Sequence, residues 1–348
     1  MKIYSAPLEG VTTYIFRNAF SEIYGHVDKY FAPFISPADN CPLTPRERKD
    51  IAPENNIGIY LVPQILTCRS EHFIEAAKEL HDMGYNEVNL NLGCPSGTVC
   101  AKGKGSGFLQ NKDALQSFLS DIYSYAESDG MKISVKTRLG YREPEEFYEL
   151  MEIFNLFPLS ELIVHPRIRT DFYKGDIRRE YFAYALEHSK CPLVYNGNIF
   201  SVKDYADLTG VFARGGDPIK MDCKGDPAVS GARLDSAVLG ARLDPIMLGR
   251  GLVSDPELAG RLKSAGAGAG RHDDAAETDY TKFRRFHDTL YHEYQKVLSP
   301  DINVLHKMRE LWTYWQVLFD GKEREIKRLM KAKKYEDYED VVYHRIFS

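Results

Sequence analysis

The sequence predicts an α/β fold in which a (β/α)8 barrel is followed by a small all-helical C-terminal domain. Three observations lead to this prediction. Eight short apolar runs rich in β-branched and aromatic residues recur over residues 1–250, and amphipathic helical patterns separate most of them. Polar and reactive side chains stand where many of these runs end, as expected for the functional face of a barrel. The sequence pattern of residues 280–348 then predicts helices throughout. A doubly wound parallel sheet is the alternative. The polar and reactive side chains at the ends of so many different predicted strands favour the barrel.

The predicted strands follow one another at regular intervals, with two longer gaps. They are Lys2–Ala6, Asp28–Pro33, Gly58–Ile65, Glu87–Leu92, Lys132–Arg138, Leu159–His165, Pro192–Asn196 and Pro245–Gly249. Helical patterns between them cover Ser70–Met83, Lys112–Tyr125, Pro144–Phe154 and Arg178–His188. One longer gap follows the fourth strand and carries a glycine-rich loop. The other contains Arg214–Arg242, with two near-copies of the sequence GARLD, which we interpret as a local duplication or surface insertion.

Composition excludes several classes of protein. With 348 residues, 43% hydrophobic and 27% charged, the chain can bury a sizeable core and is neither disordered nor fibrous. Its net charge of −5 gives no global basic field for nucleic acid. The 6 cysteines include no CxxC pair, which argues against a disulfide scaffold and against a metal site. Neither a leader-like apolar segment nor a membrane-length apolar run occurs, so we expect a soluble cytoplasmic protein.

A change of composition marks a domain boundary near residue 263. The stretch Ser264–Thr278 is small, polar and glycine-rich, which is typical of a linker. We therefore predict a barrel domain over residues 1–262, a linker over 263–279 and a helical domain over 280–348. Residues 280–348 hold 14 basic and 11 acidic residues, and the segment Lys322–Lys334 holds 7 basic and 2 acidic ones. That segment is either a solvated helix face or a local nucleic-acid surface. The tyrosines and tryptophans of Tyr291–Trp315 are expected to form the core of this domain.

The sharpest local feature is the sequence NLNLGCPS, residues 89–96, followed by GKGSG at 103–107. A buried strand here delivers two asparagines and then Cys94 to the barrel rim, beside a glycine loop. The Cys94 thiol could donate a proton or attack carbon, or it could be a small buried apolar group. Lys136 and His165 are predicted at the ends of later strands. Lys136 either forms a structural salt bridge or neutralises an anionic ring or phosphate, and His165 either donates to a ring nitrogen or satisfies a loop carbonyl.

Two glycine turns follow the last two predicted strands: Asn196-Gly197-Asn198 and Gly249-Arg250-Gly251. These are the loops with which many barrels bind phosphate, because glycine allows the backbone to approach the anion closely. Arg250 could add a charge-assisted contact. The pair of turns favours a phosphorylated cofactor over a purely conformational role.

Six motifs in this order resemble the tRNA-dihydrouridine synthase family. They are APLEGVT at residues 6–12, NLGCPS at 91–96, VKTRLG at 135–140, VHPR at 164–167, NGNI at 196–199 and GRG at 249–251. The resemblance covers most of residues 1–256. It implies an FMN-containing barrel and a helical tRNA-binding domain, which agrees with the linker and the basic segment. It also implies NADPH as electron donor and tRNA as partner, and no obligate protein partner is predicted.

The resemblance further implies roles for individual residues. Cys94 matches the proton donor, and Asn91 matches a residue facing the uracil. The flavin ring would contact Pro7, Leu8 and Glu9, with Gln64 and Lys136 at its polar edge and His165 nearby, and the phosphate would lie against Asn196, Gly197, Asn198, Gly249 and Arg250. NADPH would reduce FMN, FMN would pass hydride to C6 of uracil, and Cys94 would protonate C5. Extrusion of the target base would need compensating contacts from the helical domain.

The chain departs from the family pattern at three places. Phe108-Leu109-Gln110 is bulkier and more polar than usual after the glycine loop, Asn198 stands where an acidic residue is common, and Arg214–Arg242 expands the region before Gly249. Two other functions are kept as alternatives. One is an FMN-dependent reductase of a free pyrimidine. The other is a non-catalytic RNA-binding homologue in which the insertion has cost the barrel its flavin.

Overall fold

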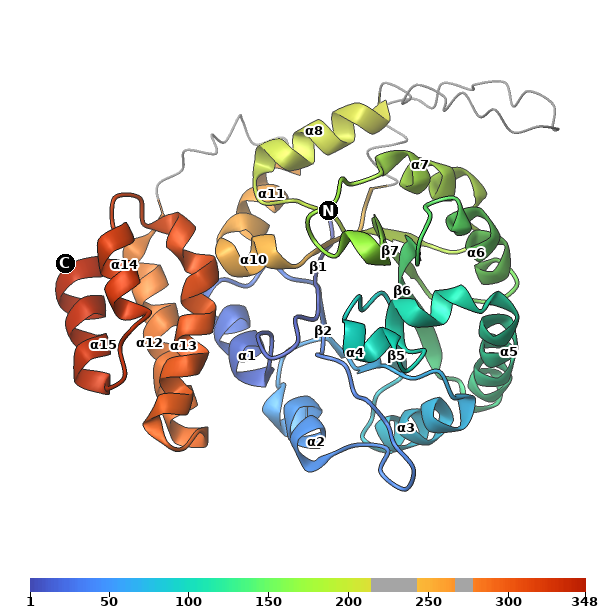
Figure 1. The fold of residues 1–348 in the computed structure, drawn as a ribbon, viewed down its shortest axis with the longest axis horizontal. Coiled ribbons are helices and arrows are strands. Elements are labelled where there is room, and N and C mark those ends of the chain that lie inside the picture. The colour runs from blue at the N-terminus through green and yellow to red at the C-terminus, as the bar shows by residue number, and fades with distance from the viewer. Residues whose placement is uncertain (214–242, 267–277) are drawn as a thin grey trace.

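The computed structural model describes residues 1–213, 243–266 and 278–348. Nine parallel strands form one sheet in the order β3-β2-β1-β9-β8-β7-β6-β5-β4, curled into a nearly closed barrel with helices around it (Figure 1). The predicted barrel is thus confirmed. The strands are β1 (Ile3–Ser5), β2 (Lys29–Phe31), β3 (Leu61–Val62), β4 (Gln64–Ile65), β5 (Glu87–Leu92), β6 (Lys132–Gly140), β7 (Leu162–Ile168), β8 (Leu193–Tyr195) and β9 (Ile246–Leu248).

The third predicted strand, Gly58–Ile65, is divided into β3 and β4 by Pro63. Proline has no N–H to donate, so a strand ladder is interrupted at that position. β3 pairs with β2, and β4 pairs with β5. The two edges of the sheet are therefore consecutive in the chain, and the barrel closes where they meet.

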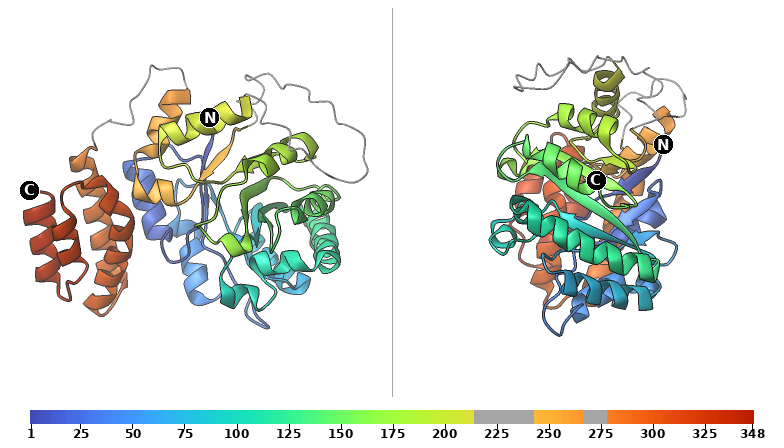
Figure 2. Two further views of the ribbon diagram at one scale, coloured as in Figure 1. Left: turned by 45° about the horizontal axis from the view of Figure 1, so that its top comes forward. Right: turned by 90° about the vertical axis from the view of Figure 1, so that its right-hand side faces the viewer.

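Helices follow most strands and cover the outside of the barrel (Figures 1 and 2). The four helices predicted between strands are confirmed, with ends shifted by a few residues, as α3, α5, α6 and α7. The helices of the barrel are α1 (Tyr14–Ile23), α2 (Pro45–Ile51), α3 (Ser70–Asp82), α4 (Gly97–Cys100), α5 (Lys112–Asp129), α6 (Glu146–Phe154), α7 (Arg179–His188), α8 (Val202–Ala213), α10 (Arg250–Ser254) and α11 (Leu258–Gly266).

Strand periodicity decides which side chains enter the barrel. In β5, Val88, Leu90 and Leu92 belong to the core outside the barrel, so Asn89 and Asn91 point to its interior. At the N-terminal ends of the strands, Lys29 Nζ lies 3.0 Å from a carboxylate oxygen of Glu87 and 3.0 Å from one of Glu161. This ion-pair cluster fills one end of the barrel, so the other end, where the strands finish, is the one left for a ligand.

The C-terminal helices pack against the barrel on the side of α1 and α10 (Figure 1). They are α12 (Tyr280–Val297), α13 (Asp301–Trp315), α14 (Glu323–Leu329) and α15 (Tyr335–Val341). Tyr291, Tyr294, Trp312 and Trp315 are buried, so the prediction that these aromatic residues form a core is confirmed for them, whereas Tyr314 is only partly buried. Phe286 of α12 meets Phe16 of α1 edge-on, with ring centroids 5.7 Å apart. One hydrophobic cluster runs from the barrel into the helices without interruption.

Two sequence features fall wholly or partly outside the described residues. The segment Arg214–Arg242 lies outside them entirely, as do residues 267–277 of the predicted linker. The predicted linker, residues 263–279, otherwise contains the last turn of α11 and the two residues before α12. In the three described ranges, no helix has both the length and the apolar character that crossing a membrane requires.

Candidate active site

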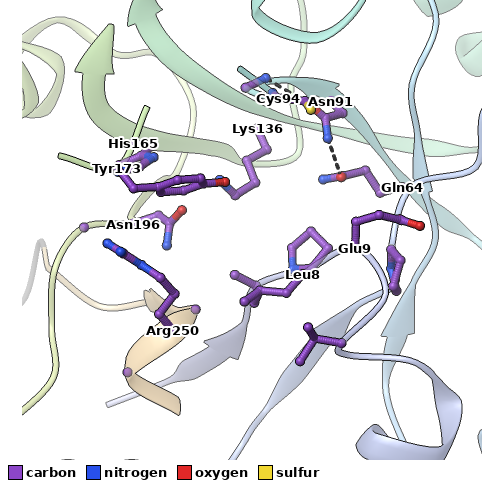
Figure 3. A pocket seen from close by; sticks show the side chains of 18 of the residues that line it. Leu8, Glu9, Gln64, Asn91, Cys94, Lys136, His165, Tyr173, Asn196 and Arg250 are labelled. Atoms are coloured by element: carbon purple, nitrogen blue, oxygen red, sulfur yellow. Dashed lines mark hydrogen bonds between the residues drawn. The ribbon is translucent and has the colours of Figure 1, made fainter. Parts of the chain in front are cut away.

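A cavity of about 380 Å³ opens at the C-terminal ends of the strands (Figure 3). Its wall contains every site residue predicted from the sequence, contributed by strands and by the loops that follow them all around the barrel. These residues are Pro7, Leu8, Glu9, Gln64, Asn91, Cys94, Lys136, His165, Asn196, Gly197, Asn198, Gly249 and Arg250. The volume falls in the range of small-molecule and cofactor sites.

Hydrogen bonds to the main chain fix the position of Cys94. Asn91 Oδ1 accepts from the backbone N–H groups of Gly93 (3.0 Å) and Cys94 (2.9 Å). Asn91 Nδ2 donates to Gln64 Oε1 at 2.6 Å, and Gln64 Nε2 donates to Asn89 Oδ1 at 2.7 Å. A ladder of buried amides therefore runs from the barrel interior to the loop that carries the thiol. Because its carbonyl oxygen is engaged, Asn91 has one N–H left for a ligand.

The glycine loop packs behind the same thiol. Gly105 has a φ of +57°, and a Cβ on it would lie 2.8 Å from the Cys94 carbonyl oxygen, so only glycine fits. Ser106 Oγ donates to that carbonyl at 2.8 Å, and Cys100 Sγ lies 3.5 Å from it. Burial raises the pKa of the Cys94 thiol, which therefore stays protonated at neutral pH.

Lys136 projects from the middle of β6 into the cavity (Figure 3). Burial, followed by the neighbouring charge of Arg138, lowers its pKa to about 7. Within the described residues, its ammonium group has neither a hydrogen-bond acceptor nor a carboxylate partner. A buried cation left unpaired by the protein is suited to an anionic ligand.

His165, on β7, lies beside Lys136, and the position of Arg167 determines which tautomer of His165 is present. Arg167 Nη1, which can only donate, lies 3.2 Å from His165 Nε2. Nε2 must therefore be the acceptor, so Nδ1 carries the proton. Burial and the surrounding positive charges lower the pKa of His165 well below its usual value. The neutral imidazole offers one donor to a ligand.

Lys136 and His165 do not stand at strand ends, as the sequence had suggested. β6 continues to Gly140 and β7 to Ile168, so both residues lie inside their strands. The extension is held by Arg138, which is fully buried and donates to the carbonyls of Gly93 (2.8 Å) and Ile168 (3.0 Å). Arg138 thus ties the loop bearing the thiol to the end of β7.

The two glycine turns come together around Asn198. Its Oδ1 accepts from Arg167 Nη1 and from Arg250 Nη2, each at 3.2 Å. Gly197, Gly249 and Gly251 all line the cavity, and a Cβ on Gly197 would overlap the Tyr195 ring, while one on Gly251 would overlap the Ile199 carbonyl oxygen. In this part of the described chain no carboxylate forms an ion pair with either arginine. Arg167 is buried in β7, whereas Arg250 lines the cavity and can present its guanidinium group to a ligand.

Sequence reasoning missed the contribution of several side chains, above all Tyr173, Glu310 and Tyr314. Arg250 Cζ lies 5.0 Å from the Tyr173 ring centroid, and Tyr173 reaches across the cavity (Figure 3). Glu310 and Tyr314 belong to α13, so the C-terminal helices form part of the cavity wall. They lie about 300 residues after Glu9, with which they share the cavity, and no local motif marks them. The VKTRLG and VHPR motifs did contain Arg138 and Arg167, to which no role was given.

The same helix holds the turn that follows β1. Lys307 Nζ donates to the carbonyl oxygen of Gly10 and lies 2.7 Å from Glu310 Oε2. Gly10 has a φ of +74°, and Pro7, Leu8 and Glu9 just before it line the cavity. Burial raises the pKa of Glu9. The position of this wall therefore depends on α13.

Comparisons with known proteins identify the family to which the chain belongs. A family model described as dihydrouridine synthase (Dus) matches residues 4–233. A probable tRNA-dihydrouridine synthase of Staphylococcus aureus (strain Mu50 / ATCC 700699) is 31% identical over 179 residues, which are 50% of this chain and 52% of that protein. A probable tRNA-dihydrouridine synthase 1 of Synechocystis sp. (strain ATCC 27184 / PCC 6803 / Kazusa) is 28% identical over 205 residues, 58% of this chain and 56% of that protein.

The matched segments thus span about half the length of these curated relatives. Among solved structures, a morphinone reductase mutant in complex with tetrahydroNAD has a TM-score of 0.48 and 11% identity, covering 77% of this chain and 87% of that one. This likeness is too weak to add to the assignment, which rests on the family model: the chain belongs to the dihydrouridine synthase family.

Proposed function

We propose that the protein is a tRNA-dihydrouridine synthase that reduces the C5–C6 double bond of a specific uridine in tRNA, with FMN as cofactor and NADPH as electron donor. One observation carries the proposal. A thiol that burial keeps protonated, Cys94, shares one cavity with Lys136 and Arg250, which form no ion pair within the described chain. Family membership and the names of the curated relatives support it.

The residues of the cavity fit FMN. A phosphate would match Arg250, which lines the cavity and lacks a carboxylate partner among the described residues. The buried Arg167 donates to the same Asn198 oxygen as Arg250 and adds positive charge nearby. Burying such charges is unfavourable until an anion balances them, so a phosphate would be bound strongly here. Pro7 and Leu8 offer an apolar surface for the ring, and Lys136 offers a cation for its polar edge. When bound and reduced by NADPH, FMN would supply a hydride to C6 of the uracil.

The protein itself would complete the reduction. As a C–H bond forms at C6, the π electrons of the C5–C6 bond take a proton from the Cys94 thiol to form the C–H bond at C5. The sulfur is left as a thiolate and regains its proton from solvent. A raised pKa suits this role, because the thiol must be protonated when the uracil arrives. Lys136 and the Nδ1–H of His165 would stabilise negative charge beside the reacting ring.

RNA would approach over the boundary between the barrel and the C-terminal helices. A second cavity, of about 730 Å³, lies between α2 and the α12–α13 turn and shares Glu9, Pro33, Phe34 and Glu310 with the first. Arg46, Lys49 and His306 are exposed around it. These groups could hold phosphates while the target base is extruded into the smaller cavity, a step that costs a few kcal/mol of stacking.

The test is to incubate the purified protein with FMN, NADPH and an unmodified tRNA transcript, and to map by mass spectrometry any fragment that gains two hydrogen atoms. Gain at a single uridine is the expected result and would identify the position. Reduction of bound FMN by NADPH without any gain on the tRNA would contradict the proposed substrate. Failure to bind FMN would contradict the proposed cofactor.

A further inference from the structure

Two loops at the mouth of the candidate active site carry a cation stacked between aromatic rings. Gly140 pairs with Ile168 at the ends of β6 and β7, so the loops that follow leave the barrel side by side. Arg169 Cζ lies 5.3 Å from the centroid of the Tyr141 ring and 5.1 Å from that of the Phe172 ring. Tyr173, the next residue, lines the cavity. The stack of Tyr141, Arg169 and Phe172, here called the rim stack, therefore adjoins the mouth.

The rim stack displays groups that a purely structural role would hide. Phe172 is 43% exposed and has a φ of +49°, an unfavourable conformation for a residue other than glycine. Arg169 Nε is buried without an acceptor. Over the described ranges, the side chains of Arg169 and of exposed Arg142 and Lys174 have no ion-pair partner. The surface thus offers an open aromatic face beside uncompensated positive charge.

We propose that the rim stack binds the nucleotide covalently joined to the uridine that enters the cavity, with its base on Phe172 and its phosphate near Arg169. This inference rests on the proposed function. A single-stranded nucleotide combines a flat π-face with a negative charge, and aromatic rings with arginine are the groups that bind it. Because the neighbour of an extruded base is tethered to it, that nucleotide must lie at the mouth, where the rim stack is.

The position of the rim stack separates it from the other basic surfaces. Around the barrel β6 lies across from β1, next to which α1 and α12 pack (Figure 1). The C-terminal helices and the rim stack therefore stand on opposite sides of the mouth. The protein would therefore hold the RNA on both sides of the target base. The C-terminal helices would contact the body of the tRNA, and the rim stack would contact the unpaired neighbour of the target base.

Three variants test the proposal: Phe172→Ala, Phe172→Trp and Arg169→Ala, with Leu156→Ala as control. Leu156 is 61% exposed and lies just after the C-terminal end of α6, away from the mouth. Using the FMN-loaded protein and a tRNA transcript, Phe172→Ala should weaken binding roughly tenfold, and Phe172→Trp should retain affinity, because stacking tolerates any large ring. Arg169→Ala should lower the slope of log K against log salt by about one. All should leave FMN reduction by NADPH unchanged.

The readouts separate the possible results. Affinity of Phe172→Ala for tRNA within about twofold of wild type would overturn the proposal, as would an unchanged salt slope for Arg169→Ala. Loss of FMN reduction in both Phe172→Ala and Arg169→Ala would also overturn it, because the rim stack would then be needed to maintain the structure of the cavity. Failure of the wild-type protein to bind FMN or tRNA would instead refute the proposed function.

Discussion

At the scale of single residues, Cys94 is the group whose environment fits its proposed task most closely. Its main chain is held by Asn91, Ser106 and the buried Arg138 through Gly93, so the thiol has a fixed position. Such preorganisation is what a proton donor requires, because a misplaced acid loses much of its rate advantage.

Cys94→Ala should therefore abolish dihydrouridine formation, by at least about a hundredfold, while FMN binding and its reduction by NADPH persist. The reason is that the alanine removes the proton for C5 and leaves Lys136 and Arg250 in place. Product is measured by mass spectrometry and flavin by its visible absorbance. Cys191→Ala is the matched control, since that thiol lies at Ser189, outside the cavity wall. Substantial product from Cys94→Ala would contradict the role.

Lys136 leads to a prediction about stability. Its pKa falls from 10.5 to about 7 on folding, so between these values the unfolded chain binds more protons and stability rises with pH. Below pH 7 the folded protein bears the full cost of the buried charge. Lys136→Met should thus stabilise the flavin-free protein by roughly 1–3 kcal/mol at pH 6 and by little at pH 10. Urea unfolding at both pH values checks this, and equal effects at the two would contradict it.

At the scale of secondary structure, the sequence predicted the elements better than their ends. Period-two and helical patterns identify the strands and the helices between them, because burial of one face is a local property of the chain. Pro63 is a local signal for the division of the third strand, but the pairing of its two halves with β2 and β5 depends on the neighbouring strands. The continuation of β7 past His165 depends on Arg138 bridging Gly93 and Ile168. Such contacts join residues far apart in sequence, so no short pattern encodes them.

The same limit applies to the site. Strand-end motifs located the thiol, the lysine and the glycine turns, since each lies in a short contiguous run. Helix α13 could not be included, because its residues meet the β1–α1 turn only after the whole barrel has formed.

Helix α13 supplies the prediction for this scale. Lys307→Met would remove the donor to the Gly10 carbonyl and free the turn that carries Pro7, Leu8 and Glu9. FMN affinity should fall several-fold, by about 1 kcal/mol for a lost hydrogen bond, and Lys307→Arg should restore part of it. Titration of the apoprotein by flavin fluorescence gives the affinity. Lys296→Met, at an exposed lysine of α12 whose partner is Glu293, is the control. Unchanged FMN affinity in Lys307→Met would show that the turn holds its own position.

At the scale of the whole molecule, the barrel and the C-terminal helices share one core and one cavity. Phe286 of α12 is fully buried against Phe16 and Phe20 of α1 and against Tyr24, the residue after α1. Glu310 and Tyr314 of α13 line the cavity. Deleting residues 280–348 would therefore open the cavity as well as remove an RNA surface. A free-pyrimidine reductase and a tRNA enzyme would both lose activity, so RNA binding has to be tested with substitutions that leave the core intact.

Exposed lysines on α14 and in the turn after it are suitable positions for such substitutions. Lys327, Lys331 and Lys334 are exposed, and in the described chain they form no ion pairs. A triple change of these residues to Gln should weaken tRNA binding and lower the slope of log K against log salt by roughly two to three, because each phosphate contact releases about one counterion. FMN reduction by NADPH should be unaffected, since none of the three lines the cavity.

A matched triple change of Lys2, Lys78 and Lys132, all on the barrel, controls for net charge alone. If both triple variants lose tRNA affinity equally, the long-range charge of the molecule and not a local surface governs binding. If only the α14 variant does, the C-terminal helices contact the RNA directly. In that case a chain of net charge −5 binds a polyanion because its positive charge is placed where the tRNA must lie.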